Sequence, residues 1–154
     1  MNRKLPRRRF LQTALALQAS WLMSSAAAEA DAGRRQVEQA IADFFGVGRS
    51  VQDGRVTVSV PAISENGYSV PLSLAVDSPM TADDYVRRVL VVSPSNPLPI
   101  VASFEFGPKA GLAQMSTRIR LADSQRIYGI AEMHDGTLWC GYGHSIVTLA
   151  ACVI

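Results

Sequence analysis

From residue 55 onward, the sequence consists of short segments in which apolar and polar residues alternate, separated by turn-forming residues. Residues 55–60, for example, would place three valines on one face of an extended chain. The breaks contain pairs that favour turns, such as Asn66-Gly67 and Asp135-Gly136. Segments spaced at intervals of about ten residues predict an all-β fold, namely a β-sandwich or, as the alternative, a closed barrel.

The predicted strands share this alternation and lie between the turn signals. They cover residues 55–60, 68–76, 85–92, 101–106, 114–121, 125–133, 137–140 and 145–150. The last two are expected to form a hairpin, because Gly141 and Gly143 between them permit positive φ angles. No helical pattern alternates with the strands, which argues against a parallel α/β sheet.

One short helix is predicted ahead of the strands, over residues 34–45. Its apolar residues fall at helical spacing and are Val37, Ala40, Ile41, Phe44 and Phe45. Gly46 and Gly48 follow as stop signals. Residues 31–149 are therefore expected to form a single mostly β domain.

Residues 1–30 are predicted to be a cleavable signal peptide. A basic start is followed by an apolar stretch over residues 11–23 and by small residues at 26–30. The stretch is shorter than the roughly 20 apolar residues that span a bilayer. Arg7, Arg8, Phe10 and Leu11 match the twin-arginine pattern, with an arginine-rich Sec signal as the alternative. The mature protein is thus expected to be periplasmic, with no membrane association after cleavage.

The charge balance changes when this leader is removed. The whole chain has a formal charge of +2, and residues 1–30 contain five basic residues and one acidic residue, so the mature part is near −2. A basic nucleic-acid-binding surface is therefore not expected.

Two cysteines, Cys140 and Cys152, are present. A disulfide is the usual interpretation for an exported domain. In the predicted hairpin, however, Cys152 lies about 23 Å beyond the position opposite Cys140. A disulfide needs Cα atoms within about 7 Å. We therefore predict that Cys140 is a buried strand residue and that Cys152 is an unpaired thiol.

A thiol close to a chain end suits a covalent carrier, because a thiolate is a nucleophile that a tail can present to several enzymes. Alternatively, Val153 and Ile154 continue the last strand, and Cys152 is packed and structural. The protein would then be a non-catalytic periplasmic interaction module of a redox system.

Neither an independent enzyme nor a metal protein is predicted. No nucleophile–base set and no glycine-rich phosphate loop is present in the sequence. Metal delivery by Cys140, His144 and Cys152 is a weaker hypothesis, because the sequence lacks the ligand spacing of a zinc site. No cofactor is expected.

Several segments of the mature chain together carry a family resemblance. They are Tyr68–Leu72, Val76–Met80, Asn96–Pro99, Phe104–Pro108, Ser116–Gln125, Ala131–Gly136 with Trp139, and Val147–Cys152. On these segments, residues 34–152 resemble the Y subunit of the Sox thiosulfate-oxidation carrier. A twin-arginine leader is also typical of that family.

The resemblance implies an immunoglobulin-like sandwich over residues 31–149 and a C-terminal cysteine arm over residues 150–154. It further implies that Cys152 attaches sulfur intermediates covalently. The implied partners are a Z-type subunit, in a heterodimer, and other periplasmic sulfur-oxidation proteins.

The arm itself departs from the family pattern. The family's arm reads Gly-Gly-Cys-Gly-Gly, whereas Ala150, Ala151, Val153 and Ile154 surround Cys152 here. Alanine and β-branched residues stiffen a chain that glycine leaves free. The ending is similar to a SoxY-related branch with an Ala-Ala-Cys-Ile-Glu arm, except that Ile154 replaces the final glutamate. The resemblance thus supports the position of the cysteine rather than the identity of its cargo.

Overall fold

The computed structural model describes residues 31–151. The predicted signal peptide with its twin-arginine motif lies outside this range, as do Cys152, Val153 and Ile154. The chain divides into two compact units at Arg35, and the description below concerns the unit from Gln36 onward. No helix within residues 31–151 is long and apolar enough to cross a membrane.

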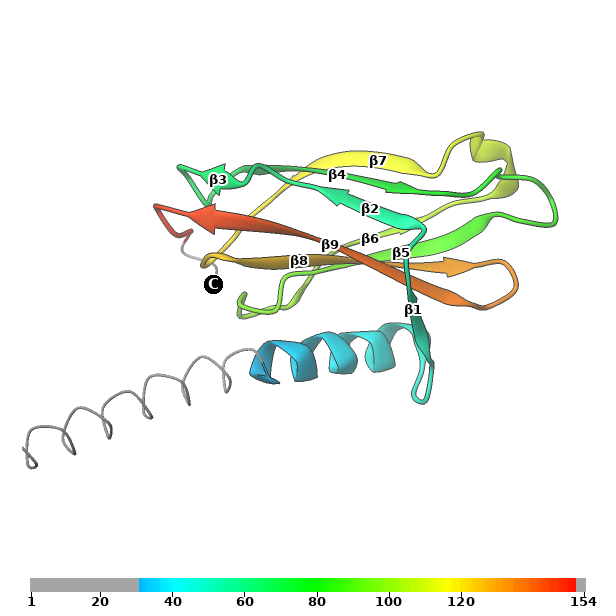
Figure 1. Ribbon diagram of the computed structural model, residues 1–154, viewed down its shortest axis with the longest axis horizontal. Coiled ribbons are helices and arrows are strands. Elements are labelled where there is room, and N and C mark those ends of the chain that lie inside the picture. The colour runs from blue at the N-terminus through cyan, green and yellow to red at the C-terminus, as the bar shows by residue number, and fades with distance from the viewer. Residues whose placement is uncertain (1–30, 152–154) are drawn as a thin grey trace, which may run out of the picture. The chain divides into compact units, whose positions relative to one another are not determined.

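The unit contains two β-sheets (Figure 1). The larger sheet has the order β1-β9-β8-β5-β6, and β3 also pairs with β9. Its strands are β1 (Val51–Asp53), β3 (Ile63–Ser64), β5 (Val86–Val92), β6 (Ile100–Glu105), β8 (Gln125–Met133) and β9 (Leu138–Val147). The smaller sheet has the order β2-β4-β7, formed by β2 (Val56–Ser59), β4 (Val70–Val76) and β7 (Gln114–Ile119). A short 3₁₀ helix, η1 (Pro108–Ala110), precedes β7.

The main core lies between the two sheets. In β4, alternate residues from Val70 to Val76 are buried, as the period of a strand with one buried face requires. They pack with β5 and β8 residues of the facing sheet, including Val89, Val91 and Ile127. The prediction of a mostly β protein with one short helix is therefore confirmed.

The described chain is helical over residues 31–45, and the part of this helix within the unit packs on the outer face of the larger sheet. Its apolar side bears Val37, Ala40, Ile41 and Phe45. These side chains form a second buried cluster with residues of β5, β8 and β9, which are Leu90, Val92, Ile130 and Leu138. The predicted end of the helix at residue 45 agrees with the structure.

The predicted hairpin around Gly141 and Gly143 is wrong. Residues 138–147 form one continuous strand, β9, which pairs antiparallel with β8 so that Gly141 lies opposite Gly129. These glycines provide space rather than a turn. A Cβ on Gly141 would overlap the Val56 carbonyl and lie 2.8 Å from its carbon. A Cβ on Gly143 would lie 3.0 Å from the carbonyl oxygen of Val58.

The sequence analysis did not predict the two short strands β1 and β3. The chain pairs with β9 through β1, crosses to the smaller sheet as β2, and returns to β9 as β3. Both contacts with β9 are parallel and only two or three residues long. Segments this short show no alternation that a sequence pattern can reveal.

The contact between β2 and β9 leads to a first prediction. Gly141→Ala should lower the free energy of unfolding by about 1–3 kcal/mol or more, because the new methyl group overlaps backbone atoms of β2 that cannot rotate away. Urea denaturation monitored by circular dichroism would measure this loss.

Gly107→Ala is the matched control. Gly107 has φ −135° and no atom within 4 Å of an added Cβ, so its replacement should leave stability nearly unchanged. Equal stability of Gly141→Ala and the wild type would contradict the close approach of the two strands.

Candidate functional site

The segment after β9, which leads to the predicted arm, is held by its backbone. Thr148 donates its N–H to the carbonyl oxygen of Ser64 at 3.1 Å, and its hydroxyl to that of Glu65 at 3.1 Å. The carbonyl oxygen of Leu149 then accepts the N–H of Gly67 at 2.8 Å. The loop before β4 therefore fastens the end of β9.

A second set of backbone hydrogen bonds reaches Ala151. Its N–H donates to the carbonyl oxygen of Leu121 at 3.0 Å, and Leu121 donates in turn to Gly67 at 2.9 Å. Gly67, Leu121, Leu149 and Ala151 thus form one connected group, which we call the C-terminal clamp. The clamp lies at the end of the sandwich where the chain leaves β9 (Figure 1).

The clamp divides the predicted arm. Ala150 is exposed, whereas the side chain of Ala151 is buried and Ala151 as a whole is only 5% exposed. Cys152, the predicted attachment point, is the next residue and lies outside the described range, as do Val153 and Ile154. Of the arm residues, the structure therefore places only Ala150 and Ala151.

Cys140 is a free, half-buried thiol on β9. It packs against the cluster beneath the helix and lies opposite Asp53 of β1. Burial, reinforced by the negative charge of Asp53, raises the pKa of the Cys140 thiol to about 11. Because the thiolate is the reactive form, Cys140 is a poor nucleophile near neutral pH. The predicted position of Cys140 in a strand is confirmed, although its side chain is half-buried rather than buried.

The two histidines lie apart from Cys140. His144 is four residues further along the same extended strand, about 13 Å away at the rise of a strand. His134 stacks on Tyr85, with ring centroids 5.4 Å apart. Within residues 31–151, no group of three or more metal-ligating side chains is close enough to hold a metal ion.

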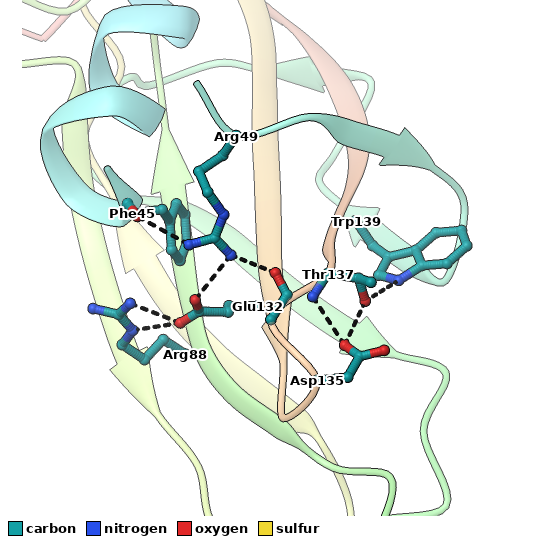
Figure 2. Close-up of polar contacts among 8 residues, drawn as sticks. Phe45, Arg49, Arg88, Glu132, Asp135, Thr137 and Trp139 are labelled. Carbon is teal, nitrogen blue, oxygen red and sulfur yellow. Dashed lines mark hydrogen bonds and ion pairs between the residues drawn. The ribbon is translucent and has the colours of Figure 1, made fainter. Parts of the chain in front are cut away.

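A buried charge cluster was missed by the sequence analysis (Figure 2). The carboxylate of Glu132 on β8 is 4% exposed. Its Oε1 accepts a hydrogen bond from Arg49 Nη2 at 3.1 Å, and its Oε2 accepts one from Arg88 Nε at 2.8 Å. The available signal was a single carboxylate in the otherwise apolar end of a predicted strand.

This cluster fastens the helix to the sheet. Arg49 also donates to the carbonyl oxygens of Phe45, at the end of the helix, and of Gly136, in the turn after β8. The Arg88 guanidinium lies 5.4 Å from the Phe45 ring centroid. Because both carboxylate oxygens of Glu132 are occupied by arginines, this residue is placed for structural support rather than for proton transfer.

Asp135 stabilises the adjacent turn (Figure 2). Its Oδ1 accepts the backbone N–H of Thr137 at 2.9 Å and the Thr137 hydroxyl at 2.8 Å. These bonds hold the pKa of the Asp135 carboxyl below its ordinary value. The Thr137 hydroxyl in turn accepts the indole N–H of Trp139 at 3.2 Å.

Comparison with known proteins identifies a matching family. Residues 41–152 match the family model described as sulfur oxidation protein SoxY. The solved sulfur carrier protein SoxY from Chlorobium limicola f thiosulfatophilum is 26% identical with a TM-score of 0.68. The match covers 78% of this chain and 98% of that protein. No curated protein matches significantly.

Two more distant structures share the fold alone. A superoxide reductase (neelaredoxin) from Ignicoccus hospitalis is 15% identical with a TM-score of 0.54, over 61% of this chain and 80% of that one. A putative superoxide reductase from Thermotoga maritima is 18% identical with a TM-score of 0.52, over 64% and 93% of the two chains.

The environment of Cys140 leads to a prediction about its reactivity. In a Cys152→Ser variant, iodoacetamide at pH 8 should alkylate Cys140 about two hundredfold more slowly than an ordinary thiol, since a pKa of about 11 leaves little thiolate. Intact mass spectrometry over time would give the rate. Urea should restore rapid labelling, whereas rapid labelling of the folded protein would disprove the assignment.

The charge cluster leads to a prediction about stability. Glu132→Gln should lower the free energy of unfolding by about 2 kcal/mol, because two arginines lose their shared counter-charge. The loss stays below that of a fully buried pair, since the Arg49 and Arg88 side chains are 31% and 33% exposed and remain partly hydrated.

Urea denaturation would measure the effect of Glu132→Gln. Glu105→Gln, on the exposed side of β6, is the control and should change stability by less than about 0.5 kcal/mol. Equal effects of the two substitutions would show that the cluster contributes nothing specific.

Proposed function

The chain belongs to the SoxY family of sulfur oxidation proteins, and we propose that it is a carrier that holds sulfur intermediates covalently on Cys152. The family match extends to residue 152 and so includes this cysteine. The similar Chlorobium protein is a sulfur carrier, which supports the same role. A carrier presents its cargo to other proteins, so no catalytic residue is assigned to the chain itself.

The observation that carries the proposal is the unsuitability of the other cysteine. Cys140 packs beneath the helix, and its raised pKa keeps it protonated at neutral pH. Because the chain has only two cysteines, covalent attachment of sulfur through a thiolate falls to Cys152.

Sulfur can be loaded onto Cys152 by thiol–disulfide-type exchange, which needs no external oxidant. The Cys152 thiolate would attack an S–S bond of a sulfur donor, forming a new bond from its sulfur to the donor's. The donor's S–S bond breaks, and its second sulfur leaves as a thiolate. Unloading is the same exchange in reverse, with an acceptor thiol as the attacking group.

The proposed setting follows from the sequence. The leader over residues 1–30 would direct the folded protein to the periplasm by the twin-arginine route. A Z-type subunit is the proposed partner in a heterodimer, and other periplasmic sulfur-oxidation proteins would load and unload the arm. The sandwich would be of the immunoglobulin-like type, and the arm would be of the Ala-Ala-Cys branch. The cargo would be thiosulfate or another sulfur species.

One observation favours a second candidate, a non-catalytic interaction module. The C-terminal clamp holds Ala151, the residue directly before Cys152, by its backbone. If that packing continued through Val153 and Ile154, Cys152 would have a structural role. The two candidates differ in whether Cys152 accepts sulfur.

Intact mass spectrometry after incubation with inorganic polysulfide separates the two candidates. The exported protein should gain whole sulfur atoms, and dithiothreitol should remove them. Cys152→Ser should gain none, whereas Cys140→Ser, the matched control, should gain as much as the wild type. Sulfur addition to Cys152→Ser, or none to the wild type, would overturn the carrier proposal.

A further inference from the structure

The anchored residue before Cys152 bears on how the thiol is presented. We propose that Gly67 is a positioning residue for the carrier thiol. Through the C-terminal clamp, it holds Ala151, the residue directly before Cys152. This inference rests on the proposed function of Cys152 and adds a means by which its reach is controlled.

The first line of evidence is the arrangement of hydrogen bonds. Gly67 uses both of its backbone groups in the clamp, because its N–H donates to Leu149 and its carbonyl oxygen accepts from Leu121. Leu121 then accepts from Ala151. Gly67 thus joins the tail to the connection between β7 and β8.

The second line of evidence is the space around Gly67. An added Cβ would overlap the carbonyl oxygen of Leu121 and would lie 2.9 Å from the nitrogen of Ala151 and 3.1 Å from the oxygen of Leu149. All three are backbone atoms of the clamp. The φ angle of Gly67 is outside the left-handed region. Glycine is therefore needed here for close approach rather than for backbone conformation.

The side chains show that the clamp holds the backbone of the tail. Leu149 is 59% exposed and Ala150 is exposed, yet the residues on either side of Ala150 are hydrogen-bonded. Only Ala151 contributes a buried side chain. The attachment thus depends on a few hydrogen bonds, each of which contributes about 1 kcal/mol.

Such a clamp has two states with different reach. When it is closed, Cys152 directly follows a held residue. When it opens, residues 149–151 are released, and each adds about 3.3–3.6 Å of extension, or about 10 Å in total. The thiol would reach a deep active site of a partner only from the open state.

Gly67→Ala in the exported protein tests the role of Gly67. The new methyl group should displace Leu149 and Ala151, because these clamp residues follow the last strand and can move more easily than Leu121. The Ala151 amide should then exchange its hydrogen about tenfold faster, as loss of one or two hydrogen bonds implies. A maleimide coupled to a bulky polymer should likewise label Cys152 about tenfold faster, relative to free iodoacetamide, because it needs the open arm.

Gly107→Ala is the control, since its added Cβ meets no atom within 4 Å. It should change neither amide exchange nor the ratio of the two labelling rates. Thermal unfolding would verify that both variants are folded. A purely structural role for Gly67 would change the unfolding temperature and leave the labelling ratio as in the wild type.

Ala151→Pro is a second test that leaves the sandwich intact. Proline removes the N–H that donates to Leu121, so the labelling ratio should shift as in Gly67→Ala. Ala150→Pro stiffens the same tail at an exposed position and should not produce this shift. Wild-type ratios in Gly67→Ala and Ala151→Pro, or an equal shift in Ala150→Pro, would overturn the inference.

The outcomes separate this inference from the proposed function. If wild-type Cys152 accepts sulfur but Gly67→Ala leaves exchange and labelling unchanged, the carrier role stands and the positioning role fails. If Cys152 accepts no sulfur, exchange at Ala151 and the labelling ratio still report whether Gly67 holds the clamp.

Discussion

The close contact between β2 and β9 is the constraint on which the rest of the sandwich depends. The Val56 carbonyl occupies the space that a side chain at Gly141 would need. Gly129, opposite Gly141 on β8, provides similar space for Leu74 of the facing sheet, which lies 2.5 Å from its added Cβ. These glycines let the smaller sheet approach closely, and they let β9 run without a break beneath it.

An unbroken β9 connects Cys140 with the segment that leads to Cys152. Near its beginning, Cys140 packs beneath the helix, which Arg49, Arg88 and Glu132 fasten to the sheet. Beyond its end, the C-terminal clamp holds Ala151. Since successive strand residues advance by about 3.4 Å, the seven steps from Cys140 to Val147 place the protected thiol near one end of the strand and the clamp beyond the other.

Local patterns in the sequence predicted the helix and most strands, because alternation and helical spacing record which side chains are buried. They failed at Gly141 and Gly143, where a glycine that permits a turn and a glycine that makes room for another strand look the same. The expected distance between Cys140 and Cys152 was derived from a hairpin that the structure replaces with one strand, and Cys152 lies outside the described residues. The sequence pattern identified Gly67 only as a turn residue, because its role depends on backbone contacts with distant segments.

The departure of the arm from the glycine pattern of its family has a physical meaning in this fold. A glycine at position 151 could form the same hydrogen bond to Leu121, but it would bury no methyl group and would lose more conformational entropy when held. Alanine lowers that entropy cost and packs its side chain, so Ala151 favours the closed clamp. A glycine arm would favour the open state over the same sandwich. For the proposed carrier, the two arms would therefore differ in how readily residues 149–151 leave the clamp.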